Sequence, residues 1–118
     1  MEAERHLRTR TKRLALRVIH LVGALPRSEA ARVIGRQLLR SGTSVGANYR
    51  AASRGRSTAD MIAKLKIVEE EADETLYWLE LLVEAELVEV TRLNDLMSET
   101  DEILAMTVAS IKTLRRRS

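Results

Sequence analysis

The chain has 118 residues and a mass of 13.3 kDa, which suits a single domain with one hydrophobic core and is too small for a multidomain enzyme. It contains no cysteine, which excludes disulfides, thiolate nucleophiles and cysteine-based zinc sites and fits a reducing compartment. One proline, five glycines and three aromatic residues are too few for a β-sandwich or barrel. The composition therefore predicts an all-α fold of long helices.

The formal net charge of +3 is unevenly distributed. Residues 1–56 carry 13 Lys/Arg against three Glu (+10), residues 57–91 carry two against ten acids (−8), and residues 92–118 carry five against four (+1). Either the basic and acidic parts neutralise each other inside a bundle, or an uncovered basic surface attracts a polyanion such as nucleic acid. No uncharged run exceeds nine residues and no secretory signal pattern opens the chain, so we expect a cytoplasmic protein without membrane contact.

Apolar residues at helical spacing predict four helices in a single domain spanning 1–118. They cover about residues 3–25, 28–54, 57–85 and 90–115. Pro26 ends the first helix because it lacks an N–H, and Ser28 and Ser57 are the expected N-caps of the second and third helices. Because the connections are short, each helix is expected to run back along the one before it. The predicted architecture is an antiparallel up-down-up-down four-helix bundle.

The core stripe of the second helix contains two polar residues, Ser41 and Asn48. A polar group in a core must be hydrogen-bonded, and a lone Asn there more often fixes the register of the helices than performs chemistry. On the third helix, Glu69 lies near the core face. It needs a hydrogen bond from Ser41, Ser44 or Asn48 to be tolerated there.

A second stripe of the same helix is rich in glycine. Its members include Gly35, Gly42, Gly46 and Tyr49. Each interior glycine costs a helix about 1 kcal/mol relative to alanine, so this stripe indicates close approach of another backbone. The third helix places large apolar side chains opposite its core face, namely Ile67, Trp78 and Leu81. We therefore expect a homo-oligomer in which this outer face, together with the glycine stripe, contacts a neighbouring subunit.

The side of the second helix opposite its core stripe is basic. Its arginines form a ridge with an uncharged middle: Arg32, Arg36, Arg40, Arg50 and Arg54. This ridge is either a solvated face paired with the acidic third helix or a surface for phosphate contact. Because no aromatic side chain is interleaved with the arginines, nucleic-acid binding there would be directed at the backbone and only weakly sequence-specific.

No catalytic or metal site follows from the sequence. His6 and His20 lack the Glu three residues earlier that a di-iron bundle requires. The segment 41–46 contains two glycines but lacks the lysine of a P-loop and the strand before it. We expect no cofactor, no metal ion and no enzymatic activity.

Three segments together resemble one known family. They are residues 38–50, with the run Ser41-Gly42-Thr43-Ser44-Val45-Gly46-Ala47-Asn48, the pair Ser57 and Asp60, and residues 71–82. These segments resemble the four-helix-bundle family named for proteins encoded in bacterial large-subunit ribosomal-RNA intervening sequences. The resemblance covers nearly the whole chain and implies an antiparallel bundle that assembles as a homopentamer. A related branch, the accessory proteins of diversity-generating retroelements, implies nucleic acid and a reverse transcriptase as partners.

Two functional hypotheses follow. The leading one is a non-enzymatic, oligomeric bundle that binds structured RNA or DNA through the basic surface of the second helix. The alternative is a protein-interaction adaptor without a nucleic-acid ligand, in which the arginines pair with the acidic third helix and the partner is another protein.

Overall fold

The computed structural model describes the backbone of residues 2–117 and the side chains of residues 6–117. Within that range it contains four helices and no strand. The helices are α1 (Glu2–Gly23), α2 (Glu29–Ser53), α3 (Thr58–Glu84) and α4 (Val90–Arg117). The expected all-α fold of four helices is therefore confirmed. The first helix ends before residue 25, and the fourth continues beyond residue 115.

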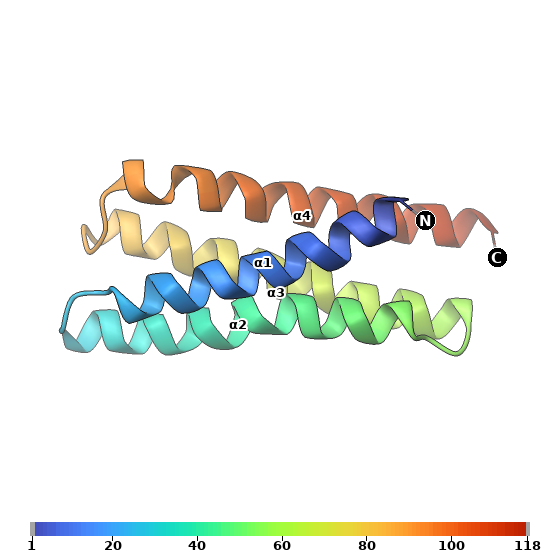
Figure 1. Cartoon of the computed structure of the whole chain (residues 1–118), viewed down its shortest axis with the longest axis horizontal. Helices are drawn as coiled ribbons and strands as arrows, with labels where there is room; N and C mark the ends of the chain where they lie inside the picture. Colours follow the sequence, from blue (N-terminus) through green and yellow to red (C-terminus); the bar gives the residue numbers. More distant parts are fainter. Residues whose placement is uncertain (1, 118) are drawn as a thin grey trace.

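The four helices lie along one another in an elongated bundle (Figure 1), with Cα extents of 48 × 21 × 19 Å. The α1–α2 and α3–α4 connections lie at one end of the bundle, whereas the α2–α3 connection and both chain ends lie toward the other. Helices that follow each other in the chain pack side by side, and α1 makes a smaller contact with α4. None of the helices within residues 2–117 is both long enough and apolar enough to cross a membrane.

Side-chain caps fix the starts of α2 and α3. The Ser28 hydroxyl accepts a hydrogen bond from the Ala31 N–H, and the Ser57 hydroxyl accepts one from the Asp60 N–H, each at 3.1 Å. Each cap satisfies one of the backbone donors that the first turn of a helix leaves free. Both serines are thus the N-caps that the sequence predicts.

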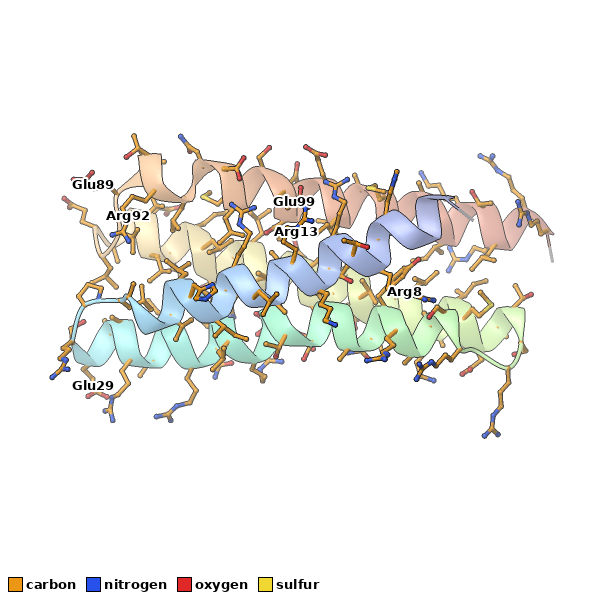
Figure 2. The ribbon with its side chains drawn as sticks, viewed as in Figure 1. Arg8, Arg13, Glu29, Glu89, Arg92 and Glu99 are labelled. Carbon is orange, nitrogen blue, oxygen red and sulfur yellow. The ribbon has the colours of Figure 1, made fainter. Side chains whose placement is uncertain are left out.

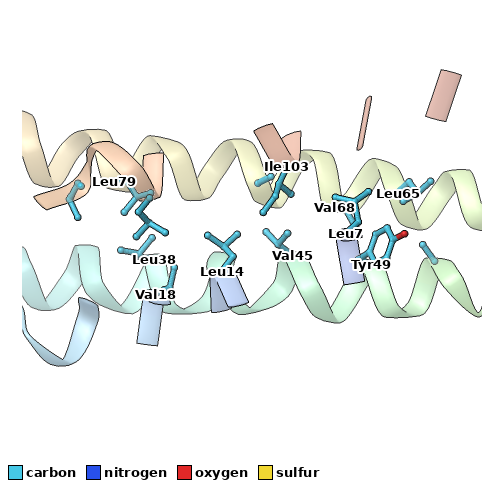
Figure 3. Close-up of a cluster of buried hydrophobic side chains, with 14 of the residues drawn as sticks. Leu7, Leu14, Val18, Leu38, Val45, Tyr49, Leu65, Val68, Leu79 and Ile103 are labelled. Carbon is cyan, nitrogen blue, oxygen red and sulfur yellow. The ribbon is translucent and has the colours of Figure 1, made fainter. Parts of the chain in front are cut away.

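Each helix contributes one apolar stripe to the core. Figure 3 shows Leu14, Leu38, Leu79 and Ile103 meeting between the helices, and each of these side chains is fully buried. Full burial of such a side chain contributes about 1.5–3 kcal/mol relative to exposure. This core fixes which side of each helix faces outward.

Hydroxyl groups occupy several core positions. Ser41 is fully buried and accepts a hydrogen bond of 3.0 Å from the Thr75 hydroxyl, which links α2 to α3. Asn48 is half-buried and donates to the Ser44 carbonyl of its own helix at 2.9 Å. Glu69 is half-buried, and neither Ser41 nor Asn48 donates to it. The hydrogen bond expected for Glu69 from these two residues is therefore not formed.

Candidate nucleic-acid interface

The glycines of α2 determine how closely α1 approaches. A Cβ added at Gly42 would lie 2.8 Å from a methyl carbon of Val18, and one at Gly46 would lie 3.1 Å from the Thr11 carbonyl oxygen. At Gly35, the nearest atoms also belong to the α1 side of the bundle, the side chains of Leu25 and Val22. Without side chains at these positions, the two helices can pack at short range.

This packing corrects one expectation from the sequence. The close approach indicated by the glycine stripe is real, but the approaching helix is α1 of the same chain. Gly35 and Gly42 are buried within the protomer, and Tyr49 belongs to its core with 5% exposure. Gly35, Gly42 and Tyr49 are therefore covered by their own chain, whereas a subunit contact at the half-buried Gly46 stays a prediction.

A groove with a volume of about 680 Å³ follows the seam between α1 and α2. Five cationic side chains line it, three from α1, one from α2 and one from the C-cap of α2: Arg8, Lys12, Arg13, Arg50 and Arg54. The other described lining residues are uncharged, and Gly46 is one of them. We call these five residues the groove cations.

All five groove cations are exposed, and none forms an ion pair with any residue that the structure describes. Figure 2 shows Arg8 and Arg13 on the same helix. Several like charges along one concave surface raise the local positive potential, which attracts anions from solution. The arrangement suits a ligand that carries regularly spaced negative charges.

Two other cations of α1, Arg10 and Arg17, are paired with acids of α4. Arg10 donates two hydrogen bonds to Glu99, at 2.6 and 2.9 Å, and one to Glu102 at 2.9 Å. The bond from the Arg10 guanidinium holds the pKa of Glu99 below its ordinary value, although burial opposes the shift. Arg17 pairs with Asp95 at 2.7 Å. These contacts attach α1 to α4.

Two arginines of the predicted ridge of α2 form ion pairs with acids on different helices. Arg32 pairs with Glu29 of its own helix at 2.6 Å. Arg40 pairs with Glu71 at 3.2 Å and with Glu74 of α3. The pKa of Glu74 is lowered first by a hydrogen bond from the Trp78 indole N–H and then by Arg40.

The remaining three arginines of the ridge lie in two places. Arg36 is exposed and lines a different cavity, of about 630 Å³, near the α1–α2 turn. Only Arg50 and Arg54 belong to the groove. Of the five predicted arginines, the structure thus brings two together with cations of α1.

Sequence reasoning missed the α1 half of the groove, namely Arg8, Lys12 and Arg13. The signal was available, because the glycine stripe of α2 also marks the side on which a second helix packs. Had α1 been assigned to that stripe, its cations next to the seam would have been included.

The outer face of α3 is partly apolar. Ile67 is 37% exposed and Tyr77 is 52% exposed, whereas Trp78 and Leu81 are half-buried. The rings of Tyr77 and Trp78 pack edge to face with centroids 5.0 Å apart. A subunit contact at Ile67, Trp78 and Leu81 stays a prediction.

Within the described part of the chain, no three His, Asp or Glu side chains come together in a way that could hold a metal ion. The buried polar side chains there all have hydrogen-bond partners.

Comparison with known proteins identifies the family. The 23S rRNA-intervening sequence protein family matches residues 5–109. A crystal structure at 1.70 Å of a protein of unknown function, from the S23 ribosomal protein family of Bacteroides thetaiotaomicron, has a TM-score of 0.88 and 35% sequence identity. That match covers 93% of this chain and 98% of the other. No curated protein matches the chain. Because the family match extends over most of the sequence, the chain belongs to the 23S rRNA-intervening sequence protein family.

Proposed function

We propose that this protein is a non-enzymatic cytoplasmic bundle, antiparallel and homo-oligomeric, that binds the sugar-phosphate backbone of structured RNA or DNA in the α1–α2 groove. The observation that carries the proposal is the set of five groove cations, which line one surface and have no acidic partner among the described residues. Phosphate contacts of this kind release counterions and supply most of the affinity of sequence-independent binding.

The chemistry of the groove favours a duplex over an extended single strand. Proteins that bind single strands without sequence preference use aromatic side chains on which bases stack. None of the described residues lining the groove is aromatic, because Tyr49 lies in the core and Tyr77 and Trp78 lie on α3. Contacts to phosphates alone position a protein on its ligand without reading the sequence. Membership of a family named for ribosomal-RNA intervening sequences makes duplex RNA the first ligand to test.

A homopentamer is the assembly that we propose for this bundle. The exposed Ile67 and Tyr77, beside the half-buried Trp78 and Leu81, support a subunit contact on the outer face of α3. Sedimentation equilibrium at micromolar concentration should give a mass close to five chains. A monomer under these conditions would contradict the proposed assembly and leave the groove unaffected.

The binding test compares two triple variants that remove the same charge. Arg8→Ala, Arg50→Ala and Arg54→Ala together remove three groove cations, whereas Arg27→Ala, Arg32→Ala and Arg92→Ala remove three arginines elsewhere. Fluorescence anisotropy with duplex RNA is measured over a range of salt concentrations. The groove variant should reduce the log–log salt slope by about 2.7, since each lost phosphate contact contributes about 0.9. The control should keep the wild-type slope. The proposal is contradicted if the wild type does not bind duplex RNA at low salt, or if the groove and control variants lose equal affinity.

A second candidate function is the protein-interaction adaptor. It is favoured by the pairing of Arg40 with Glu71 and Glu74, which neutralises the middle of the α2 ridge, and by the exposed apolar side chains of α3. The two functions differ in their response to nuclease. Associates of a nucleic-acid binder are lost when a pull-down is treated with nuclease, whereas those of an adaptor are retained.

A further inference from the structure

The two ends of the bundle carry different charges. At the end with the α2–α3 connection, the segments 50–60 and 110–117 contain seven Lys/Arg and one acid, and the start of α1 at the same end adds Glu2, Glu4 and Arg5, for a formal charge of +5. At the other end, residues 24–32 and 84–92 contain three Arg and four Glu, a formal charge of −1. Figure 2 shows Glu29, Glu89 and Arg92 at this second end. The molecule is thus polarised along its long axis.

Cations from α4 and from the α2–α3 turn account for most of the positive end. Beyond the groove cations Arg50 and Arg54, it contains Arg56, Lys112, Arg115, Arg116 and Arg117, all exposed. We call these five residues the basic pole. The last turns of α2 and α4 end here, and the negative end of a helix dipole favours cations.

The acid nearest the α2–α3 turn, Asp60, is already engaged. Asp60 accepts a hydrogen bond from Lys64 at 3.1 Å and one from the Arg56 N–H at 3.2 Å, and these contacts lower the pKa of its carboxyl group. Asp60 therefore faces Lys64 and Arg56, and none of the described cations of α4 is among its partners.

The basic pole lies next to the groove. Arg117 of α4 and Ser53 of α2 line one cavity of about 370 Å³ between the helix ends. Ser53 precedes Arg54, which lines the groove. The end of α2 therefore borders both the groove, through Arg54, and the cavity that Arg117 lines, through Ser53.

We propose that the basic pole is the second half of the nucleic-acid site, so that one duplex contacts the groove and the end of α4 at the same time. This inference rests on the proposed nucleic-acid function. The bundle measures 21 × 19 Å across its Cα atoms, and a duplex strand advances about 3.4 Å per phosphate, so the crossing takes about six phosphates. A single molecule of about 20 base pairs is long enough to reach both parts.

The test uses Lys112→Ala, Arg116→Ala and Arg117→Ala in the full-length chain. All three side chains are exposed at the end of a helix, and alanine is a good helix former, so the fold is expected to persist; circular dichroism checks this. The matched control is again Arg27→Ala, Arg32→Ala and Arg92→Ala, with the same loss of charge at the other end. The probes are duplex RNA and duplex DNA of about 20 base pairs and one sequence.

Binding to both duplexes should weaken at least tenfold at about 0.1 M salt, with a salt slope smaller by about 2.7, and the control should bind as the wild type does. Combining the pole and groove variants should add their slope losses, with unchanged stoichiometry. RNA and DNA should respond alike, because phosphates are common to both. If the pole variant loses affinity for only one of the two duplexes, the backbone contact proposed for the pole is overturned.

Three other outcomes also overturn the inference. The first is a pole variant that binds both duplexes as the wild type does while the groove variant loses affinity; the proposed function then stands. The second is a wild type that binds two duplexes and a pole variant that binds only one, with the salt slope of groove binding unchanged. The pole would then be a separate site. The third is a pole variant that loses binding to vesicles of phosphatidylcholine and phosphatidylserine but binds both duplexes as the wild type does. If the wild type binds neither duplex, the proposed function itself fails.

Discussion

The two sides of α1 carry the same kind of residue but make different contacts. On the side facing α4, Arg10 forms hydrogen bonds with Glu99 and Glu102 and Arg17 pairs with Asp95. On the side facing α2, Arg8 and Lys12 line a groove without acidic residues among those described. The charge of a segment therefore does not determine whether it is a binding surface. What decides is whether the helix packed against it supplies carboxylates.

The close packing of α1 on α2 keeps both sides of α1 in place, and Gly42→Ala should disturb it most. The new Cβ would lie 2.8 to 3.1 Å from three atoms of Val18, a stiff β-branched side chain, so the helices must move apart. We expect a loss of about 2 kcal/mol in the free energy of unfolding, measured by urea denaturation.

Gly23→Ala is the matched control for that substitution. Apart from the adjacent residues and the backbone of α1 itself, no atom lies within 4 Å of a Cβ at Gly23, so the gain in helix propensity should stabilise the protein by up to about 1 kcal/mol. If the two substitutions changed the free energy of unfolding in the same direction, the role assigned to Gly42 would be contradicted.

The two sides of α1 can be compared directly by replacing Arg10 and Lys12 with Met. Arg10→Met leaves Glu99, whose side chain is only 22% exposed, without its charged donor, so the free energy of unfolding should fall by about 1.5 kcal/mol. Lys12→Met should change it by less than about 0.5 kcal/mol and should instead weaken duplex binding. Equal effects on stability would remove the distinction between the two sides.

The Arg10 contact should also make stability depend on pH. Because hydrogen bonds from Arg10 lower the pKa of Glu99 in the folded protein, this carboxylate stabilises the fold at pH values above its unfolded pKa of about 4.5. The stabilisation is lost as pH falls below that value, so the free energy of unfolding from urea titrations should be lower at pH 3 than at pH 7. In Arg10→Met the loss between the two pH values should be smaller. An unchanged pH dependence would exclude this ion pair as its source.

The sequence was sufficient for the fold but not for the site. The ends of the helices are set by nearby residues, namely Pro26, Ser28 and Ser57, and the apolar stripes identify the core faces. The four helices can therefore be predicted from residues that are close in sequence. The groove depends on which two helices pack together, and this is determined by contacts between residues far apart in the sequence. The ridge of α2 was therefore predicted as one surface, although Arg40 pairs with an acid of α3 and Arg50 lines the seam with α1.

The smallest effect concerns a hydroxyl pair that links α2 to α3, as Arg10 links α1 to α4. The single hydroxyl proton of Thr75 is shared between the buried Ser41 hydroxyl at 3.0 Å and the Glu71 carbonyl at 2.7 Å, whereas the buried Thr100 donates only to the Leu96 carbonyl of its own helix. Valine keeps the shape of threonine but removes the donor. Thr75→Val should therefore cost about 1 kcal/mol in the free energy of unfolding, and Thr100→Val less than half of that, because no partner on another helix loses its bond. Equal costs in urea denaturation would mean that the bond between the helices adds nothing to the bond within each helix.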